Sequence, residues 1–306
     1  MKKFVRIAKK TQEELKTYLE TTLKMNYGYK VISGDGYLYA PGEVPVLLVA
    51  HLDTVHKKVP ENVYYDTNTG TISSPQGIGG DDRCGVYMIL KIIKKHRCHV
   101  LFCEDEEVGA KGAQKFIKAE CAEGLKFNYM IELDRMNSND AVFYDCDNPE
   151  FEEFITQEFY ETSWGSFSDI SYLAPHFGCA AVNLSCGYYN AHTLKEYVVF
   201  SEMLDSIEAV CKILERTTEE DKFEYIESAY GYGKYWYGDG LYGGSSYKSS
   251  FYDYDYYIIE YVDLNGNVKW EEEYARNRNE AIGRFCVENP KIPYENVIEV
   301  CYESRY

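Results

Sequence analysis

The chain has 306 residues, 45% of them hydrophobic, which is enough for one large domain with a sizeable core and a smaller second unit. Its 50 acidic residues exceed its 32 basic residues, and the resulting net charge of −18 argues against nucleic acid and anionic membranes as partners. No stretch is apolar enough for a signal peptide or a membrane span, and the ten cysteines form no CxxC pair. We therefore expect reduced thiols and a cytoplasmic protein.

The first 220 residues alternate between helical and extended patterns. Thr11 and Glu14 have the spacing of a capping box at the start of an amphipathic helix. An apolar run predicts a buried strand that ends at His51. The predicted elements are a helix at 11–24, strands at 29–32, 37–40 and 45–50, a hairpin around 68–70, a helix at 84–95, a strand at 99–103, a helix at 110–119, a strand at 127–133, a helix at 150–161, a strand at 179–184 and a helix at 196–215. This alternation predicts an α/β fold, a three-layer α/β/α domain with a mostly parallel mixed sheet.

The composition changes after about residue 220. Residues 221–257 become rich in Tyr, Gly and Ser and show no helical or strand period, which indicates an irregular connector. Order returns at 258–306, where a hairpin, a helix at 277–289 and a strand at 297–302 predict a small α+β unit. The predicted organisation is a domain at 1–220, a connector at 221–257 and a β-β-α-β unit at 258–306.

Five short motifs carry residue types that bind metals, and each lies at a predicted strand end or helix start. The loops at such places converge on one edge of an α/β sheet. Imidazole and carboxylate groups suit zinc, and two neighbouring divalent ions need a bridging anion and several carboxylates. In chain order, the motifs are His51-Leu52-Asp53, Gly79-Gly80-Asp81-Asp82, Asp105-Glu106-Glu107-Val108-Gly109, Glu132-Leu133-Asp134 and His192-Thr193-Leu194-Lys195-Glu196.

Each motif taken alone has an ordinary structural explanation. His51 and Asp53 could form a hydrogen bond at a strand end, and Asp81 and Asp82 could cap a turn or a helix. The acidic run at 105–107 could be a solvated surface, Asp134 could cap a turn, and His192 could be a buried, hydrogen-bonded histidine. The ordered combination of all five motifs favours a metal site.

The ordered motifs resemble those of the zinc-dependent exopeptidase superfamily, which includes peptidase T, the glutamate carboxypeptidases, the aminoacylases, and the leucyl and glutamyl aminopeptidases. The resemblance covers about residues 10–215. It implies a co-catalytic pair of Zn²⁺ ions, with Co²⁺ or Mn²⁺ as alternatives. It also implies that Asp81 bridges the two metals, that His51 and Asp134 complete one of them, and that Glu107 and His192 complete the other.

The same resemblance implies roles for two further residues. Glu106 would be the general base, and Asp53 would orient His51. The peptide bond between Asp81 and Asp82 would be cis. The adjacent carboxyl of Glu132 leaves an alternative to Asp134 as the ligand, although the Leu-Asp ending of the strand favours Asp134.

Many members of the superfamily carry a large lid or dimerisation insertion. Here only 29 residues separate His51 from Asp81, and 57 separate Asp134 from His192. Neither gap can hold such a domain, so the chain resembles the lidless aminopeptidases. Ser168-Asp169 weakly resembles the Ser-Asp pair found before the final strand in the aminopeptidase branches.

The expected reaction is hydrolysis of a peptide or N-acyl bond at a chain end. Glu106 would deprotonate the attacking water and then donate the proton to the leaving amine. An aminopeptidase is the first hypothesis, with Glu132 or Asp169 facing the free amine of the substrate. The alternatives are a carboxypeptidase, an N-acyl amino acid deacylase, or a binding protein that keeps the fold but has lost turnover.

Several other residues with reactive side chains are interpreted as structural. Cys98, His99 and Cys103 alternate along a strand and favour core packing, and His56 and His176 are expected to be surface or packing residues. The C-terminal unit is expected to shape access to the site or to dock the enzyme onto an assembly.

Overall fold

The computed structural model describes residues 1–228, 255–264, 266–275, 285, 289, 291–292 and 296–303. The chain divides into two compact units, Met1–Gly238 and Asp239–Tyr306. The described part of the chain contains no helix that is both long and apolar enough to cross a membrane.

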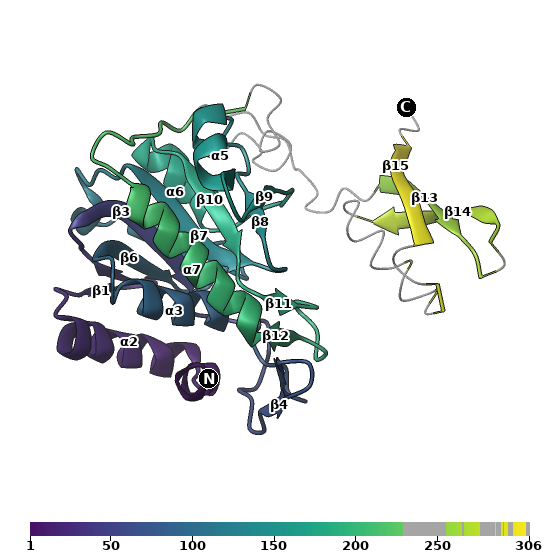
Figure 1. Cartoon of the computed structure of the whole chain (residues 1–306), viewed down its shortest axis with the longest axis horizontal. Helices are drawn as coiled ribbons and strands as arrows, with labels where there is room; N and C mark the ends of the chain where they lie inside the picture. The colour runs from purple at the N-terminus through teal and green to yellow at the C-terminus, as the bar shows by residue number, and fades with distance from the viewer. Residues whose placement is uncertain are drawn as a thin grey trace, which may run out of the picture. The chain divides into compact units, whose positions relative to one another are not determined.

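An eight-stranded mixed sheet forms the centre of the first unit (Figure 1). Its four central strands are parallel, whereas β1, β2 and β8 each run antiparallel to a neighbour. This arrangement confirms the predicted α/β fold with a mostly parallel sheet. The strands lie in the order β1 (Ile32–Gly34), β2 (Tyr37–Ala40), β6 (Cys98–Cys103), β3 (Val44–His51), β7 (Tyr129–Arg135), β10 (Ala181–Ser185), β8 (Asp140–Val142) and β9 (Glu161–Thr162).

Helices cover both faces of this sheet because its central strands are apolar on both sides. Leu48 of β3 belongs to one buried cluster and the adjacent Leu47 to the other, as alternation along a strand requires. The first cluster packs against α1 (Lys2–Ala8), α2 (Gln12–Tyr27), α3 (Gly80–Ile92), α5 (Pro149–Thr156) and α7 (Phe200–Arg216). The second packs against α4 (Lys111–Phe116) and α6 (Ile170–Phe177), and a short 3₁₀ turn spans Glu120–Ala122.

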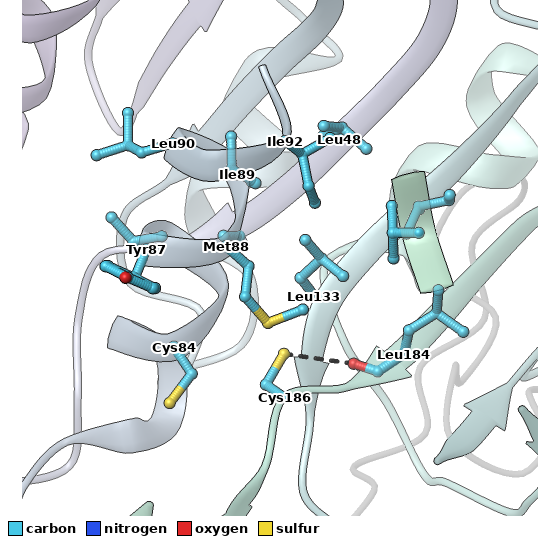
Figure 2. Close-up of a cluster of buried hydrophobic side chains, with 14 of the residues drawn as sticks. Leu48, Cys84, Tyr87, Met88, Ile89, Leu90, Ile92, Leu133, Leu184 and Cys186 are labelled. Carbon is cyan, nitrogen blue, oxygen red and sulfur yellow. Dashed lines mark hydrogen bonds between the residues drawn. The ribbon is translucent and has the colours of Figure 1, made fainter. Parts of the chain in front are cut away.

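Helix α3 packs directly on the middle of the sheet (Figure 2). Its buried side chains, Met88 among them, contribute to the same cluster as Leu133 of β7 and Leu184 of β10. Gly85 makes the close approach possible, since a Cβ there would lie 1.8 Å from the carbonyl oxygen of Leu133. The start of α3 is therefore held against the carboxyl end of β7.

A second, four-stranded antiparallel sheet has the order β11 (Tyr188–Tyr189), β12 (Tyr197–Val199), β5 (Thr71–Ser73) and β4 (Tyr64–Asp66). It corrects one expectation, because the helix predicted at 196–215 begins only at Phe200. Residues 197–199 instead pair with β5 and partly with β11, and Val198 is completely buried there. The His192–Glu196 motif consequently lies in a loop between β11 and β12.

The remaining boundaries differ from the predictions by a few residues. The predicted capping box is present: Thr11 Oγ1 accepts from the Glu14 backbone N–H at 3.3 Å, and Glu14 accepts from the Thr11 N–H at 3.1 Å. Helix α3 begins at Gly80 rather than residue 84, with Asp81 and Asp82 in non-helical conformations. The sequence patterns missed α1 and α6.

The second unit contains a three-stranded antiparallel sheet, in which β13 (Asp255–Val262) lies between β14 (Val268–Ala275) and β15 (Val297–Glu303). Ile259 and Phe285 are buried, and the Phe285 ring lies 4.6 Å from that of Tyr261. The predicted helix at 277–289 falls almost wholly outside the described residues, as do connector residues 229–254. At the end of the first unit, the backbone of Glu224 pairs with that of Cys179, and the backbone of Glu227 with that of Cys146, as isolated antiparallel β-bridges. The division at residues 220 and 257 stays a prediction.

Candidate metal centre

The five candidate ligands come from loops and strand ends at one edge of the central sheet. His51 ends β3, and Asp134 lies near the end of the neighbouring parallel strand β7. Glu107 follows β6, and Asp81 lies at the start of α3. His192 comes from the loop between β11 and β12, where its φ of 64° is left-handed. Parallel strands bring their carboxyl ends to a common edge, and the structure brings all five side chains together there.

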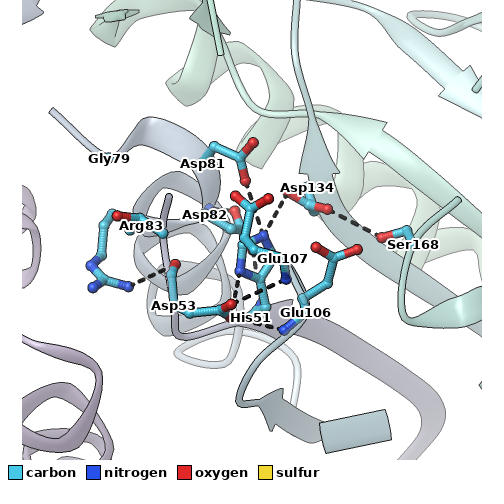
Figure 3. A network of polar contacts seen from close by, with 12 residues as sticks. His51, Asp53, Gly79, Asp81, Asp82, Arg83, Glu106, Glu107, Asp134 and Ser168 are labelled. Atoms are coloured by element: carbon cyan, nitrogen blue, oxygen red, sulfur yellow. Dashed lines mark hydrogen bonds and ion pairs between the residues drawn. The ribbon is translucent and has the colours of Figure 1, made fainter. Parts of the chain in front are cut away.

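Two groups of three residues share the carboxyl group of Asp81: His51, Asp81 and Asp134 form one, and Asp81, Glu107 and His192 form the other. Figure 3 shows the first group together with Glu107. His51 Nε2 lies 3.0 Å from Asp81 Oδ1 and 3.3 Å from Asp134 Oδ1. His192 Nε2 lies 3.1 Å from Asp81 Oδ2 and 3.1 Å from Glu107 Oε2. Within each group the potential ligand atoms all lie within 4.8 Å of one another. Asp81 therefore offers one oxygen to each group.

The donor set fits a pair of divalent metal ions. Two ligand atoms held about 2.0–2.1 Å from one tetrahedral zinc ion lie roughly 3.3 Å apart, close to the 3.0–3.3 Å distances found here. A second observation supports the fit, because Glu107 Oε1 is buried and has no hydrogen-bond partner among the described residues. Three carboxyl groups face two imidazoles, an imbalance of charge that cations would relieve.

Asp53 orients His51 and the backbone of the loop that carries Glu106 and Glu107. Its Oδ1 accepts from His51 Nδ1 at 3.2 Å and from the Glu106 backbone N–H at 3.0 Å, and its Oδ2 accepts from the Glu107 N–H at 3.1 Å. Burial favours a higher pKa for Asp53, but His51 and these two N–H groups together bring the pKa below its ordinary value. With Nδ1 bound to Asp53, Nε2 is the ring nitrogen that faces Asp81 and Asp134 and that would bind a metal. The peptide bond between Asp81 and Asp82 is cis.

Glu106 lies beside the candidate ligands, and Figure 3 shows it on the side of Asp134. Burial is the largest cause that raises its pKa, to about 10, with further contributions from Asp134, Asp169 and Glu132 and opposition from His51. Cations bound to the neighbouring ligands would lower this pKa. Glu106 is therefore a carboxyl group whose proton affinity depends on metal occupancy.

Glu132 and Asp169 lie completely buried. The backbone N–H of Ile170 lies 3.4 Å from Glu132 Oε2, while Asp134 is the strand residue that joins the ligand cluster. Ser168 Oγ donates to Asp134 Oδ2 at 3.1 Å, so Ser168 helps to orient this candidate ligand. Because Glu132 and Asp169 are inaccessible, we assign no contact with a substrate amine to either of them.

Two further residues support the site through a contact that the sequence patterns did not indicate. His56 was expected to be a surface or packing residue, yet its Nε2 donates to Glu196 Oε2 at 2.8 Å. Glu196 is completely buried and also accepts hydrogen bonds from the backbone N–H groups of Gly79 and Asp81. The His-x-x-x-Glu spacing indicated Glu196, but no local pattern could have paired it with His56. His99 does pack in the core region, where it hydrogen bonds to Tyr39 at 2.7 Å.

Comparison with known proteins finds one family model that matches part of the chain and several structures with a similar fold. The model of peptidase family M28 matches residues 37–169. The sequence matches no curated protein. The structure is similar to aminopeptidase PepT from Bacillus cereus, with a TM-score of 0.57 and 15% identity over 70% of this chain and 96% of the other. A tripeptidase from Staphylococcus aureus gives a TM-score of 0.56 and 15% identity over 69% and 96% of the two chains. A TET aminopeptidase from a marine sediment archaeon, Thaumarchaeota archaeon, gives 0.56 and 14% over 72% and 98%.

The match to the model of peptidase family M28 over residues 37–169 and the shared fold support the resemblance to zinc-dependent exopeptidases that the motifs indicated.

The metal-free protein should lose stability as the pH rises from about 4 to 10. Burial raises the pKa of Asp169 to about 7 and of Glu106 to about 10, and hydrogen bonds to Asp81 and Glu107 raise that of His192 to about 11. Since the folded state binds these protons more tightly, their stabilisation is complete below the unfolded pKa values and is lost as pH rises through the folded ones.

Thermal melting of chelator-treated protein between pH 4.5 and pH 9 measures this effect. Asp169→Asn is the matched control, because it removes one titrating carboxyl and should flatten the lower part of the profile. A melting temperature that rises over this range in the metal-free protein would contradict the expectation. Excess zinc should stabilise the protein most at the upper end, where the ligands are deprotonated.

Proposed function

We propose that the chain is a co-catalytic dizinc exopeptidase, and that it is an aminopeptidase. The observation that carries this proposal is Asp81, whose two oxygens are each shared with a different imidazole and a different further carboxyl group. Glu106 lies beside this arrangement as the proton acceptor that hydrolysis requires. The names of the similar structures, an aminopeptidase and a tripeptidase, support the substrate class.

In the proposed mechanism, Asp81, His51 and Asp134 would hold one ion, and Asp81, His192 and Glu107 would hold the other. When bound, such ions polarise the scissile carbonyl and lower the pKa of water. Glu106 takes the proton from the attacking water and passes it to the leaving amine. Asp53 keeps the His51 ring in one tautomer and, through two backbone N–H groups, fixes the position of Glu106 and Glu107.

The site is open to a substrate on the side of His192, whose side chain is 54% exposed. Val108 and Leu194, which flank ligands in sequence, are also exposed. The segments between the ligands are compact, because only β4 and β5 lie between His51 and Asp81. An open, acidic site suits a short peptide with a cationic amino end. A carboxypeptidase or a deacylase remains the alternative, since both use the same metal chemistry.

We further propose that the protein works in a reducing compartment such as the cytoplasm. Eight cysteines of the described residues are free thiols, and seven of these are buried. Buried thiols without disulfides are typical of reducing surroundings.

The first prediction from the proposed function concerns metal content. Protein purified without chelator should contain two zinc ions per chain by elemental analysis. Glu107→Gln should lose one ion, because it removes a ligand from only one group, whereas Asp81→Ala should lose both. A wild-type protein that neither contains zinc nor binds it on titration would exclude a metal centre.

The second prediction separates catalysis from metal binding. Glu106→Gln should retain the zinc content and lower kcat by about 10²–10⁴-fold, because the amide cannot accept the proton. Glu123→Gln, at an exposed position, is the matched control and should leave kcat unchanged. Wild-type turnover in Glu106→Gln would remove this residue from the mechanism, and a wild-type protein that binds zinc and peptides without turnover would favour the binding-protein alternative.

The third prediction concerns the free amine of the substrate. Dipeptides and tripeptides with a free amino end should be hydrolysed at least tenfold faster than their acetylated forms, in line with the loss of one charge-assisted contact, worth about 1.5–3 kcal/mol. Paired assays of the same peptides, with amidated carboxyl ends as a second comparison, measure this difference. Faster hydrolysis of the acetylated peptides would favour a deacylase, and dependence on the free carboxyl end would favour a carboxypeptidase.

A further inference from the structure

The carboxyl group of Glu196 lies completely buried beside the metal centre and joins three separate segments of the chain. Its Oε2 accepts from the backbone N–H of Gly79 at 2.8 Å and from His56 Nε2 at 2.8 Å. Its Oε1 accepts from the backbone N–H of Asp81 at 3.0 Å. The two backbone groups belong to the turn that contains Asp81, so Glu196 is hydrogen bonded to this turn on both sides of Gly80.

Each of the three segments also carries a candidate metal ligand. His56 lies in the loop that follows β3, the strand that ends at His51. Glu196 lies in the same loop as His192. The third segment contains Asp81 itself. A displacement of Glu196 would therefore act on His51, Asp81 and His192 together, and these residues supply ligands to both groups.

The packing around the turn shows how tightly it is held. A Cβ at Gly80 would lie 2.7 Å from Tyr188 Cβ and 3.3 Å from Glu196 Oε1, so only glycine fits between these side chains. Gly79 has a left-handed φ of 64°. A Cβ at Gly77 would lie 2.3 Å from the ring of His56. The glycine-rich turn thus packs directly against the side chains of Glu196 and His56, and larger residues at Gly77 or Gly80 would displace them.

The direction of the Asp81 side chain follows from this turn. The N–H of Asp81 is bound to Glu196, which fixes the peptide plane from which the side chain projects. Its Oδ1 then reaches His51 and its Oδ2 reaches His192. A small rotation of this peptide would take one oxygen away from one group. Glu196 therefore does more than satisfy its own hydrogen bonds, because its position also sets the direction of the Asp81 side chain.

We propose that Glu196 and His56 form a brace that positions Asp81 between the two metals, with Glu196 as a positioning residue and His56 as the group that fixes Glu196. This inference rests on the proposed dizinc centre. The brace contacts neither a metal nor a substrate, and its effect is exerted through Asp81. Residues that orient ligands in this way typically change metal affinity by about 10–100-fold when they are replaced.

The test measures zinc affinity by competition with a chromophoric chelator, and ligand geometry by the visible spectrum of the cobalt-substituted protein. Glu196→Gln replaces one acceptor oxygen by an amide NH₂, which cannot accept the N–H of Gly79 or Asp81. Its zinc affinity should fall by about 10–100-fold, and its cobalt spectrum should change. His56→Ala should shift both readouts in the same direction by a smaller amount.

Matched controls and a double variant make the result specific. Glu208→Gln and His176→Ala replace exposed residues of the same types and should leave zinc affinity and the cobalt spectrum unchanged. The double variant His56→Ala with Glu196→Gln should show a loss smaller than the product of the single losses, since both act through one contact.

Two outcomes would overturn the brace. The first is that the variants melt earlier in the metal-free state but bind zinc with wild-type affinity and give the wild-type cobalt spectrum, which would reduce the brace to a contribution to folding. The second is that wild-type protein binds no zinc, which would remove the metal centre together with the brace. If Glu196→Gln does not fold, the same two readouts on His56→Ala decide the question, because that variant keeps the carboxyl group of Glu196 and its two backbone hydrogen bonds.

Discussion

The sharing of one carboxyl group between two imidazoles is the constraint on which the rest of the site depends. Asp81 must present its two oxygens in different directions at fixed distances from His51 and His192. The surrounding structure is arranged to achieve this: the start of α3 is held against β7 by the absence of a side chain at Gly85, and the turn before it fits against Glu196. The sheet fixes the opposite side, because β3 and β7 are paired in parallel register and carry His51 and Asp134.

The accumulation of carboxyl groups at this edge has an electrostatic cost, which protonation or a bound cation relieves. Glu106, Asp134 and Asp169 all have pKa values raised by burial, and each is raised further by at least one of its acidic neighbours. Asp53 escapes this effect because two backbone N–H groups and His51 bind its oxygens. The contrast separates two kinds of carboxyl group: those satisfied by protein hydrogen bonds and those left for a ligand.

Much of this arrangement could be predicted from the sequence, because each motif and the strand or helix beside it are recognisable from neighbouring residues. The five ligand candidates each follow a recognisable strand or precede a helix, and parallel strands bring such ends together. The start of α7 was wrong by four residues because tertiary pairing of Tyr197–Val199 overrides their helical continuity. The contact between His56 and Glu196 spans 140 residues and depends on loop geometry, so no period or motif could indicate it.

The order of the ligands along the chain also sets when the centre can form during synthesis. His51 emerges from the ribosome early. Asp134, which belongs to the same group, follows about eighty residues later, and His192 and Glu196 come last. Until that loop has emerged, a nascent chain displays isolated imidazole and carboxyl groups that bind cations weakly and without order. The proposed metal pair would therefore be bound only late, once β10 and the loop bearing His192 have been added to the sheet. A chain truncated before residue 192 would hold at most half of the centre.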